Sequence, residues 1–177
     1  MNQHARHEPV VPEKSRRNFL KLAALGGGVS LLAALPEARS AGATDVFLLT
    51  CMDFRLMDDI ERYMAGRGLR DKYDHVILAG ASLGAVTDKF PAWNKTFWEH
   101  LDIAIELHNI HTVMIMDHRD CGAYKVVLGE AHTKDPKTEK DTHSAQLKML
   151  KGMINQKFPK LKVETLLMGL DGKVEAA

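Results

Sequence analysis

Four apolar runs divide the chain between positions 45 and 170. Each is continuous in apolar residues, or nearly so, and is followed by a polar or glycine-rich stop, which is the pattern of a buried β-strand. The runs lie at 46–50, 75–78, 112–116 and 163–170. Asp171-Gly172, directly after the last run, is a turn signal. We therefore predict four strands, the last of them close to the C-terminus.

Segments with helical periodicity separate these runs. In one of them Trp98, Leu101 and Ile105 share a face at spacings of three and four. Predicted helices cover 57–66, a segment that opens at Pro91, the residues after 122, and 143–157. Small residues at 79–85 predict a turn, and the charged segment at 131–141 predicts an exposed loop.

Strands that alternate with helices predict an α/β fold, with a mainly parallel β-sheet flanked by helices and a strand added at the C-terminus. Sites in such sheets lie beyond the carboxyl ends of the strands. Cys51 directly follows the first run, and His118 and Cys121 follow the third. Because adjacent parallel strands end at the same edge of a sheet, we expect these three side chains to lie close together.

Residues 1–43 have the organisation of an export signal. A twin-arginine sequence at 15–21 precedes an apolar stretch at 22–35, and small residues at 41–43 fit a cleavage site. The apolar stretch is too short and too rich in glycine for a stable membrane span. We predict a signal peptide that the twin-arginine export machinery recognises, and a mature domain at 44–177 that is periplasmic or secreted. The alternative is a buried, glycine-kinked helix.

Composition and charge exclude several classes of function. The 177 residues suggest one folded domain, and 45% hydrophobic and 27% charged residues are ordinary for a globular protein. A formal net charge of +1 supplies no basic field that would recruit nucleic acid. Two cysteines are too few for a disulfide framework.

The two cysteines instead have neighbours suited to a metal. Positions 51–55 read Cys-Met-Asp-Phe-Arg, and 118–122 read His-Arg-Asp-Cys-Gly. Two thiolates and one imidazole suit Zn²⁺, and three protein ligands leave the fourth tetrahedral position free. We predict that Cys51, His118 and Cys121 bind one zinc ion. The alternatives are a buried cysteine pair or a disulfide, with His118 as a core histidine.

Asp53 and Arg55 determine which group occupies that fourth position. Asp53 either occupies it and closes the site, or pairs with Arg55 and leaves the position to water. Zinc would lower the pKa of such a water toward about 7 and so supply a hydroxide at neutral pH. The alternative for the two residues is a structural ion pair.

In these segments the sequence resembles the β-class carbonic anhydrases. Positions 51–55 match the Cys-x-Asp-x-Arg motif of that family, and 118–123 match its His-x-x-Cys-Gly-Ala motif. The resemblance extends over roughly 45–175, almost the whole of the predicted mature chain.

The resemblance implies a β-carbonic-anhydrase-like fold and a set of roles. Zinc would be held by Cys51, His118 and Cys121, and Asp53 and Arg55 would be the catalytic pair that orients or gates the zinc-bound water. The implied reaction is the reversible hydration of carbon dioxide to bicarbonate and a proton by zinc-bound hydroxide. The implied assembly is a homodimer or a higher homo-oligomer.

The chain departs from the family pattern in places. The family's Arg-Asn-Ala-Gly is replaced by Ile-Leu-Ala-Gly at 77–80, and Asp117 stands where the family has glycine. Asp117 is either a hydrogen-bond acceptor beside the metal loop or an ordinary loop residue. Cleavage near 44 would also leave almost none of the family's N-terminal arm.

Two further functions stay open from the sequence. One is hydrolysis of carbonyl sulfide or carbon disulfide at the same zinc site, and the other is non-catalytic binding of zinc or bicarbonate. Of the remaining histidines we expect most at the surface or in packing, with His143 as a candidate proton relay. Arg119 and Asp120 are predicted to form a solvated turn.

Overall fold

A computed structural model describes residues 44–177, so the predicted export signal at 1–43 lies outside the described residues. The described chain forms a five-stranded sheet in the order β2-β1-β3-β4-β5. The strands are β1 (Val46–Thr50), β2 (Tyr73–Ile77), β3 (Thr112–His118), β4 (Lys162–Met168) and β5 (Val174–Ala176). The first four run parallel and β5 is antiparallel to β4, which confirms the predicted α/β fold with a mainly parallel sheet.

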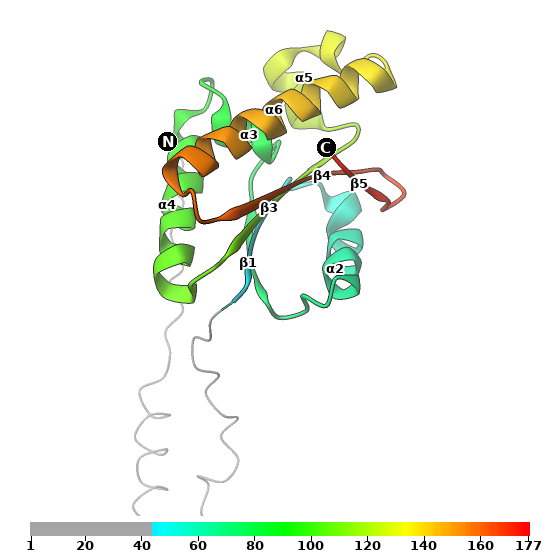
Figure 1. The fold of residues 1–177 in the computed structure, drawn as a ribbon. Helices are drawn as coiled ribbons and strands as arrows, with labels where there is room; N and C mark the ends of the chain where they lie inside the picture. The colour runs from blue at the N-terminus through cyan, green and yellow to red at the C-terminus, as the bar shows by residue number, and fades with distance from the viewer. Residues whose placement is uncertain (1–43) are drawn as a thin grey trace, which may run out of the picture. The chain divides into compact units, whose positions relative to one another are not determined.

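Helices cover both faces of this sheet (Figure 1). They are η2 (Phe54–Leu56), α2 (Met57–Gly66), α3 (Ser82–Val86), α4 (Pro91–His108), α5 (Gly122–Leu128), η3 (Glu130–His132) and α6 (Pro136–Lys157). One core cluster joins the sheet to α3, α4, α5 and α6, and a second joins its other face to α2. Strand β1 is consequently buried along its whole length. In the part of the chain that the structure describes, no helix is long and apolar enough to cross a membrane.

The register of the central strands places the two motif loops side by side. Strands β1 and β3 pair in parallel with Thr50 opposite Met116. Cys51, one residue beyond Thr50, therefore emerges at the level of Asp117 and next to His118. The predicted approach of the loops at 51–55 and 118–122 follows directly from this pairing.

The helices and strands differ from the predicted ones mainly at their ends. Strand β3 continues to His118 because β4 pairs along it as far as Met168. Strand β2 begins and ends earlier than the predicted run at 75–78. Beyond the predicted turn at Asp171-Gly172 the chain adds the short edge strand β5, whose three residues are too few to show a pattern.

Two predicted connecting segments are wrong because they contain helix. The segment at 79–85, predicted as a turn, holds most of α3. The segment at 131–141, predicted as an exposed loop, contains the beginning of α6 at Pro136. The side chain of Asp135 accepts hydrogen bonds from the first backbone N–H groups of that helix. An acidic cap followed by proline is a helix start, and the high charge of the segment hid it.

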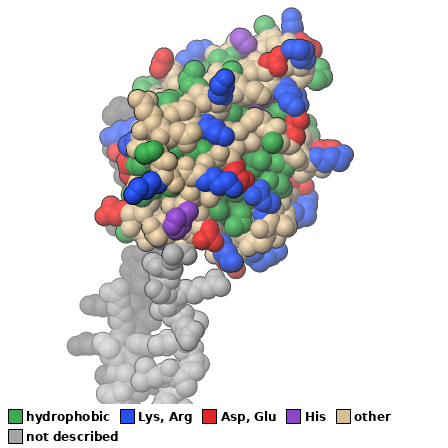
Figure 2. Space-filling model, in the orientation of Figure 1, with side chains coloured by type: hydrophobic (Ala, Val, Ile, Leu, Met, Phe, Trp, Pro, Cys, Tyr) green, Lys and Arg blue, Asp and Glu red, His purple; other side chains and the backbone are tan. Residues whose placement is uncertain are grey.

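Charges on the described surface are mixed. Figure 2 shows Lys and Arg side chains interspersed with Asp and Glu side chains on the face that is drawn, with small apolar areas between them. This distribution agrees with the near-zero formal net charge of the sequence.

Candidate metal centre

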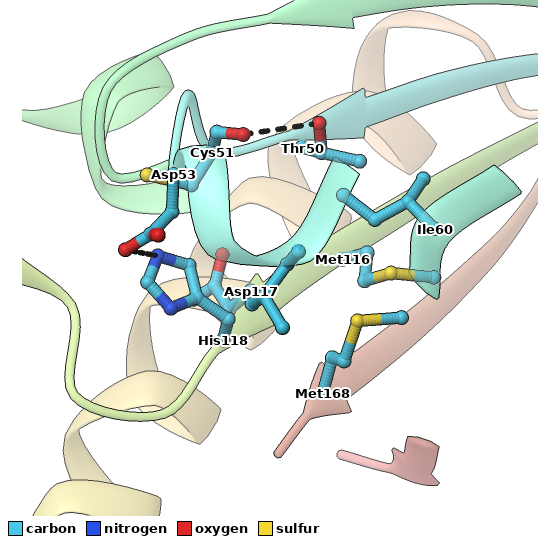
Figure 3. A pocket seen from close by; sticks show the side chains of 9 residues that line it. Thr50, Cys51, Asp53, Ile60, Met116, Asp117, His118 and Met168 are labelled. Atoms are coloured by element: carbon cyan, nitrogen blue, oxygen red, sulfur yellow. Dashed lines mark hydrogen bonds and ion pairs between the residues drawn. The ribbon is translucent and has the colours of Figure 1, made fainter. Parts of the chain in front are cut away.

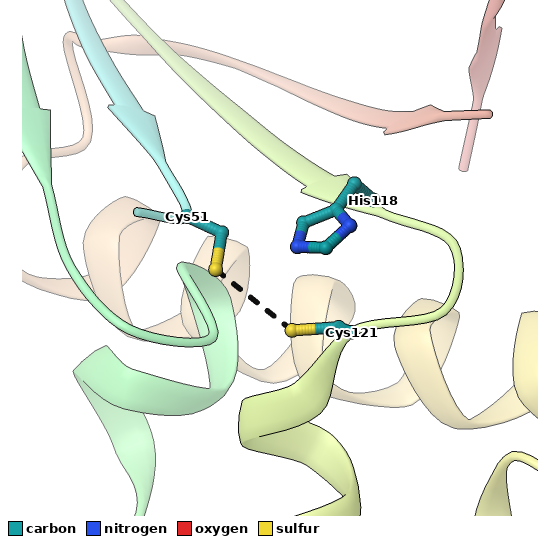
Figure 4. A group of neighbouring side chains, drawn as sticks. All are labelled: Cys51, His118 and Cys121. Carbon is teal, nitrogen blue, oxygen red and sulfur yellow. Dashed lines mark hydrogen bonds between the residues drawn. The ribbon is translucent and has the colours of Figure 1, made fainter. Parts of the chain in front are cut away.

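Three side chains from two loops meet at the carboxyl edge of the sheet. Cys51 follows β1, His118 is the last residue of β3, and Cys121 precedes α5. Their ligand atoms all lie within 4.8 Å of one another, and the two Sγ atoms are 3.8 Å apart. All three side chains are buried, and Figure 4 shows them turned toward one another. The predicted proximity is therefore observed.

The hydrogen bonds of His118 suit a metal ligand. Its Nδ1 lies 2.8 Å from the carbonyl oxygen of Arg119, a contact in which Nδ1–H donates. The other ring nitrogen, Nε2, is then an acceptor, and it is buried without a hydrogen-bond partner in the described residues. The nearest carboxylate oxygen, Asp53 Oδ2, is 3.7 Å from it, beyond hydrogen-bond distance. A metal ion would satisfy this buried lone pair.

The two thiols differ in acidity. The hydrogen bond between the sulfur atoms lowers the pKa of the Cys51 thiol and raises that of the Cys121 thiol. The backbone N–H of Gly80 also donates to Cys51 Sγ at 3.3 Å. Both cysteines are free in the described chain rather than joined in a disulfide. Because zinc binds cysteine as thiolate, metal binding here would release a proton from the cysteine pair. The donor set fits zinc.

Asp53 lies beside the cluster and pairs with Arg55. Two guanidinium hydrogen bonds, from Nε to Oδ1 at 2.9 Å and from Nη2 to Oδ2 at 2.7 Å, make a bidentate pair. The backbone N–H of Arg55 donates to Oδ1 as well, so Asp53 also caps η2. The Arg55 hydrogen bonds lower the pKa of the Asp53 carboxyl to about 2. Of the two arrangements open from the sequence, the structure has the paired one.

Asp120 is a second partner of Arg55, which the sequence did not predict. Arg55 Nη1 donates to Asp120 Oδ2 at 3.0 Å, and Nη2 donates to the Asp120 carbonyl oxygen at 3.2 Å. Lys125 pairs with the other carboxylate oxygen, and the backbone N–H of Asp120 donates to Glu139 at 2.6 Å. The loop that carries His118 is thus tied to the loop that carries Asp53.

The turn at 119–120 is partly solvated, with the Asp120 side chain 46% exposed, and it is also held in place by contacts that were not predicted. Arg119 donates to the Pro136 carbonyl oxygen at 2.9 Å and to Glu175 at 2.8 Å, and its own N–H donates to Met168 O at 2.9 Å. Asp120 has a φ of 55°, in the left-handed region that aspartate tolerates better than most residues. An aspartate between two ligands was the available signal, but its partners lie far away in the sequence.

The segment at 77–80 keeps a backbone role despite its departure from the family pattern. Ile77 is about half exposed and Leu78 packs at the edge of the core. Gly80, with a φ of +76°, supplies the N–H that reaches Cys51, and a Cβ there would lie 3.2 Å from Ala123 Cβ. The close approach of Gly80 to Cys51 and Ala123 needs glycine but does not need the family's Arg-Asn pair.

A small cavity adjoins the cluster (Figure 3). Its volume is about 10 Å³, close to what one water molecule needs. It is lined by Thr50, Cys51, Asp53, Leu56, Ile60, Met116, Asp117, His118 and Met168. The candidate ligands Cys51 and His118 lie with Asp53 on one side, and Ile60, Met116 and Met168 form an apolar side (Figure 3). A small, uncharged molecule suits such a lining.

His143, the candidate proton relay, is completely buried. Its Nδ1 lies 2.9 Å from Asp117 Oδ2, a contact inside the core between α6 and β3. It therefore lacks the contact with solvent that a relay requires. Asp117 is also buried and is an acceptor rather than a loose loop residue.

Residues 42–177 match the model of the family described as "Putative carbonic anhydrase". The chain belongs to this family. The match covers the whole described domain and both motif loops, so the family expected from positions 51–55 and 118–123 is confirmed.

The chain has uncharacterized relatives in sequence and a carbonic anhydrase among the solved structures of similar fold. An uncharacterized protein of Rickettsia conorii is 42% identical over 137 residues, which cover 77% of this chain and 74% of the relative. An uncharacterized protein of Rickettsia bellii is 40% identical over 77% of this chain and 84% of its own length. Among solved structures, the carbonic anhydrase of Streptococcus mutans aligns over 92% of this chain and 93% of its own, at 18% identity and a TM-score of 0.51. At this identity the likeness concerns the fold.

Proposed function

We propose that the protein is a zinc-dependent carbonic anhydrase, which interconverts carbon dioxide and water with bicarbonate and a proton. The observation that carries this proposal is a buried cluster of two thiols and one imidazole whose neighbouring carboxylate is engaged elsewhere. Because Asp53 is paired with Arg55, three protein groups face the metal position and a fourth place is left for water.

Cys51, His118 and Cys121 would hold the zinc. When bound, zinc supplies a Lewis acid that lowers the pKa of water toward about 7. Asp53, with a pKa of about 2, is a permanent hydrogen-bond acceptor at neutral pH and orients water beside the cluster. Arg55 keeps that carboxylate aimed. The apolar side chains that line the cavity match carbon dioxide in polarity, and they must shift to admit it, because the cavity has room for about one water molecule.

Stopped-flow measurement of carbon dioxide hydration tests this proposal, with the variant His118→Gln compared with the variant His108→Gln. His108 pairs with Asp74 away from the cluster, so it controls for the loss of an imidazole. We expect zinc-dependent hydration by the unaltered protein, its loss in His118→Gln and on chelation, and its retention in His108→Gln. Zinc-loaded protein that hydrates no carbon dioxide contradicts the proposal, and turnover of carbonyl sulfide or carbon disulfide instead assigns the centre to that hydrolysis.

Non-catalytic binding of zinc or bicarbonate is the competing proposal. It requires Asp53, or another protein group, in the fourth position. The four hydrogen bonds that the Arg55 guanidinium makes with Asp53 and Asp120 oppose such a movement of the Asp53 side chain.

We also propose that the protein acts outside the cytoplasm, after recognition of the sequence at 15–21 by the twin-arginine export machinery. That route carries folded proteins, so the thiols would bind zinc before they meet an oxidising compartment. Replacing Arg16 and Arg17 by lysine should retain the protein in the cytoplasmic fraction. Unchanged export of that variant contradicts this route.

Assembly into a homodimer or a higher homo-oligomer is part of the same proposal. Phe54 and Met52, on either side of Asp53, are 86% and 65% exposed. Large apolar side chains at this exposure are typical of contact surfaces when they lie together. Light scattering after size-exclusion chromatography measures the mass, and a monomer at micromolar concentration contradicts the assembly.

A further inference from the structure

Asp117 is a buried carboxylate with a full set of hydrogen-bond donors. Its relative exposure is 1%, and it accepts the backbone N–H of Ser82 on Oδ1 at 3.0 Å. Three more donors meet at Oδ2: Ser82 Oγ at 2.7 Å, Tyr124 OH at 2.6 Å and His143 Nδ1 at 2.9 Å. A buried carboxylate is costly unless such donors replace water, so the arrangement is maintained as a unit.

The donors come from the segments that carry or support the ligands. Ser82 begins α3, two residues after Gly80, whose N–H contacts Cys51 Sγ. Tyr124 stands three residues after Cys121, in the first turn of α5. Asp117 itself precedes His118 on β3. One carboxylate thus joins the surroundings of all three candidate ligands.

Helix α6, the third helix in contact with Asp117, also contacts the loop between His118 and Cys121. His143 lies on α6, one turn beyond Glu139, which accepts the backbone N–H of Asp120 at 2.6 Å. The ring of Tyr124 packs against that of His143 with centroids 3.9 Å apart. Helix α6 is therefore fixed to the end of β3 through Asp117 and to the following loop through Glu139.

We propose that Asp117 is a positioning residue of the metal centre. By accepting hydrogen bonds from α3, α5 and α6 it sets the separation of Cys51, His118 and Cys121 before the metal binds, and so strengthens metal binding. This inference rests on the proposed metal site but not on carbon dioxide as the substrate.

Asparagine at this position tests the idea with almost no change of volume. The Oδ2 atom of Asp117 receives three donors, whereas an amide nitrogen in its place accepts none and has only two protons to offer. At least one contact is lost, and the remaining partners must reorient. Tyr124→Phe is the milder variant, because it removes a single donor. The matched controls are Asp74→Asn, from the Asp74–His108 pair, and Tyr63→Phe, whose hydroxyl accepts from Arg67.

The readouts are zinc affinity, measured by competition with a chromophoric chelator, and the thiolate-to-metal charge-transfer absorption of the Co²⁺ form. We expect about 10- to 100-fold weaker zinc binding and an altered absorption band in Asp117→Asn. We expect a smaller loss in Tyr124→Phe and no change in either control. Circular dichroism at the same temperature establishes that each variant is folded.

The outcomes separate this inference from the proposed function. Folded variants with unaltered affinity and absorption overturn it, as does a Tyr124→Phe variant that loses only thermal stability if Asp117→Asn fails to fold. If the unaltered protein gives no thiolate absorption with Co²⁺ and binds no zinc, the metal site fails and this inference fails with it. Normal metal binding without carbon dioxide hydration overturns only the proposed function.

Discussion

At the scale of single residues, the guanidinium of Arg55 lies between the carboxylates of Asp53 and Asp120. Its guanidinium meets Asp53 through Nε and Nη2, and it meets Asp120 through Nη1 and Nη2. The pairing with Asp53 could be predicted, because the residues are two apart in a recognisable motif. The contact with Asp120 could not, since it depends on the packing of two loops 65 residues apart and on a left-handed backbone at Asp120.

Arg55→Lys should lower the hydration rate and leave the zinc content unchanged. One ammonium cannot hold Asp53 through two parallel hydrogen bonds and also reach Asp120, so the Asp53 carboxylate loses its fixed direction. We expect about a 100-fold lower hydration rate, the size of effect that misplacing a reacting group produces. The rate is measured by stopped flow and the zinc content by elemental analysis. Arg67→Lys, which alters contacts with Tyr63 and Glu164, should leave both values unchanged.

At the scale of elements, close packing explains why helix α3 was wrongly predicted as a turn. The small residues at 79–85 resembled a turn, but they let α3 approach the preceding segment. A Cβ on Gly84 would collide with the Ala79 carbonyl oxygen and approach the Leu78 side chain. Alternating strands and helices were predictable from periodicity, whereas this requirement appears only when α3 is in place.

Gly84→Ala should therefore destabilise the fold, by about 1–3 kcal/mol, as overpacking of a core usually does. Gly152→Ala is the matched control, because Gly152 lies within α6 with nothing near its missing Cβ. There we expect a stabilisation of about 0.5–1 kcal/mol from higher helix propensity. Urea unfolding measures both changes, and equal effects of the two substitutions would contradict the packing argument.

The contact between β2 and β1 gives a pH dependence. His75 Nε2 lies 2.8 Å from Thr50 Oγ1, and partial desolvation of the ring lowers the pKa of His75 below its ordinary value of 6.5. The unfolded chain then binds a proton at a higher pH than the folded one. The contribution of His75 to the free energy of unfolding should be constant above about pH 6.5 and should fall as the pH drops below that value.

Denaturant unfolding between pH 5 and pH 8 tests this dependence. His75→Gln should have a smaller loss of stability on acidification than the unaltered protein, and His111→Gln serves as a control outside the contact between β1 and β2. An unchanged slope in His75→Gln would mean that the imidazole is protonated as easily in the folded protein as in the unfolded chain.

At the scale of the whole molecule, the parallel sheet makes one site from two distant loops. The family and the fold could be predicted, because motifs and strand ends are local in sequence. The support of the site could not, because Asp117, Glu139 and Arg119 act through partners on α3, α5, α6 and β5. The edge strand β5, too short to show a pattern, supplies Glu175 to that support.

Removing zinc should weaken the entire fold. A ligand that binds only the folded state stabilises it by about 2.7 kcal/mol at a free concentration 100 times its dissociation constant. We expect chelation to lower the melting temperature and added zinc to restore it. A double variant, Cys51→Ser with Cys121→Ser, should show no zinc-dependent change. A zinc-dependent shift of the same size in that variant would place the metal elsewhere.

The most direct test is X-ray absorption spectroscopy of the zinc-loaded protein between pH 6 and pH 9. We expect one zinc per chain with two sulfur ligands, one imidazole nitrogen and one exchangeable oxygen from water, while Asp53 stays paired with Arg55. Four protein ligands at every pH, or protein without bound zinc and with its cysteines in a disulfide, would contradict this expectation.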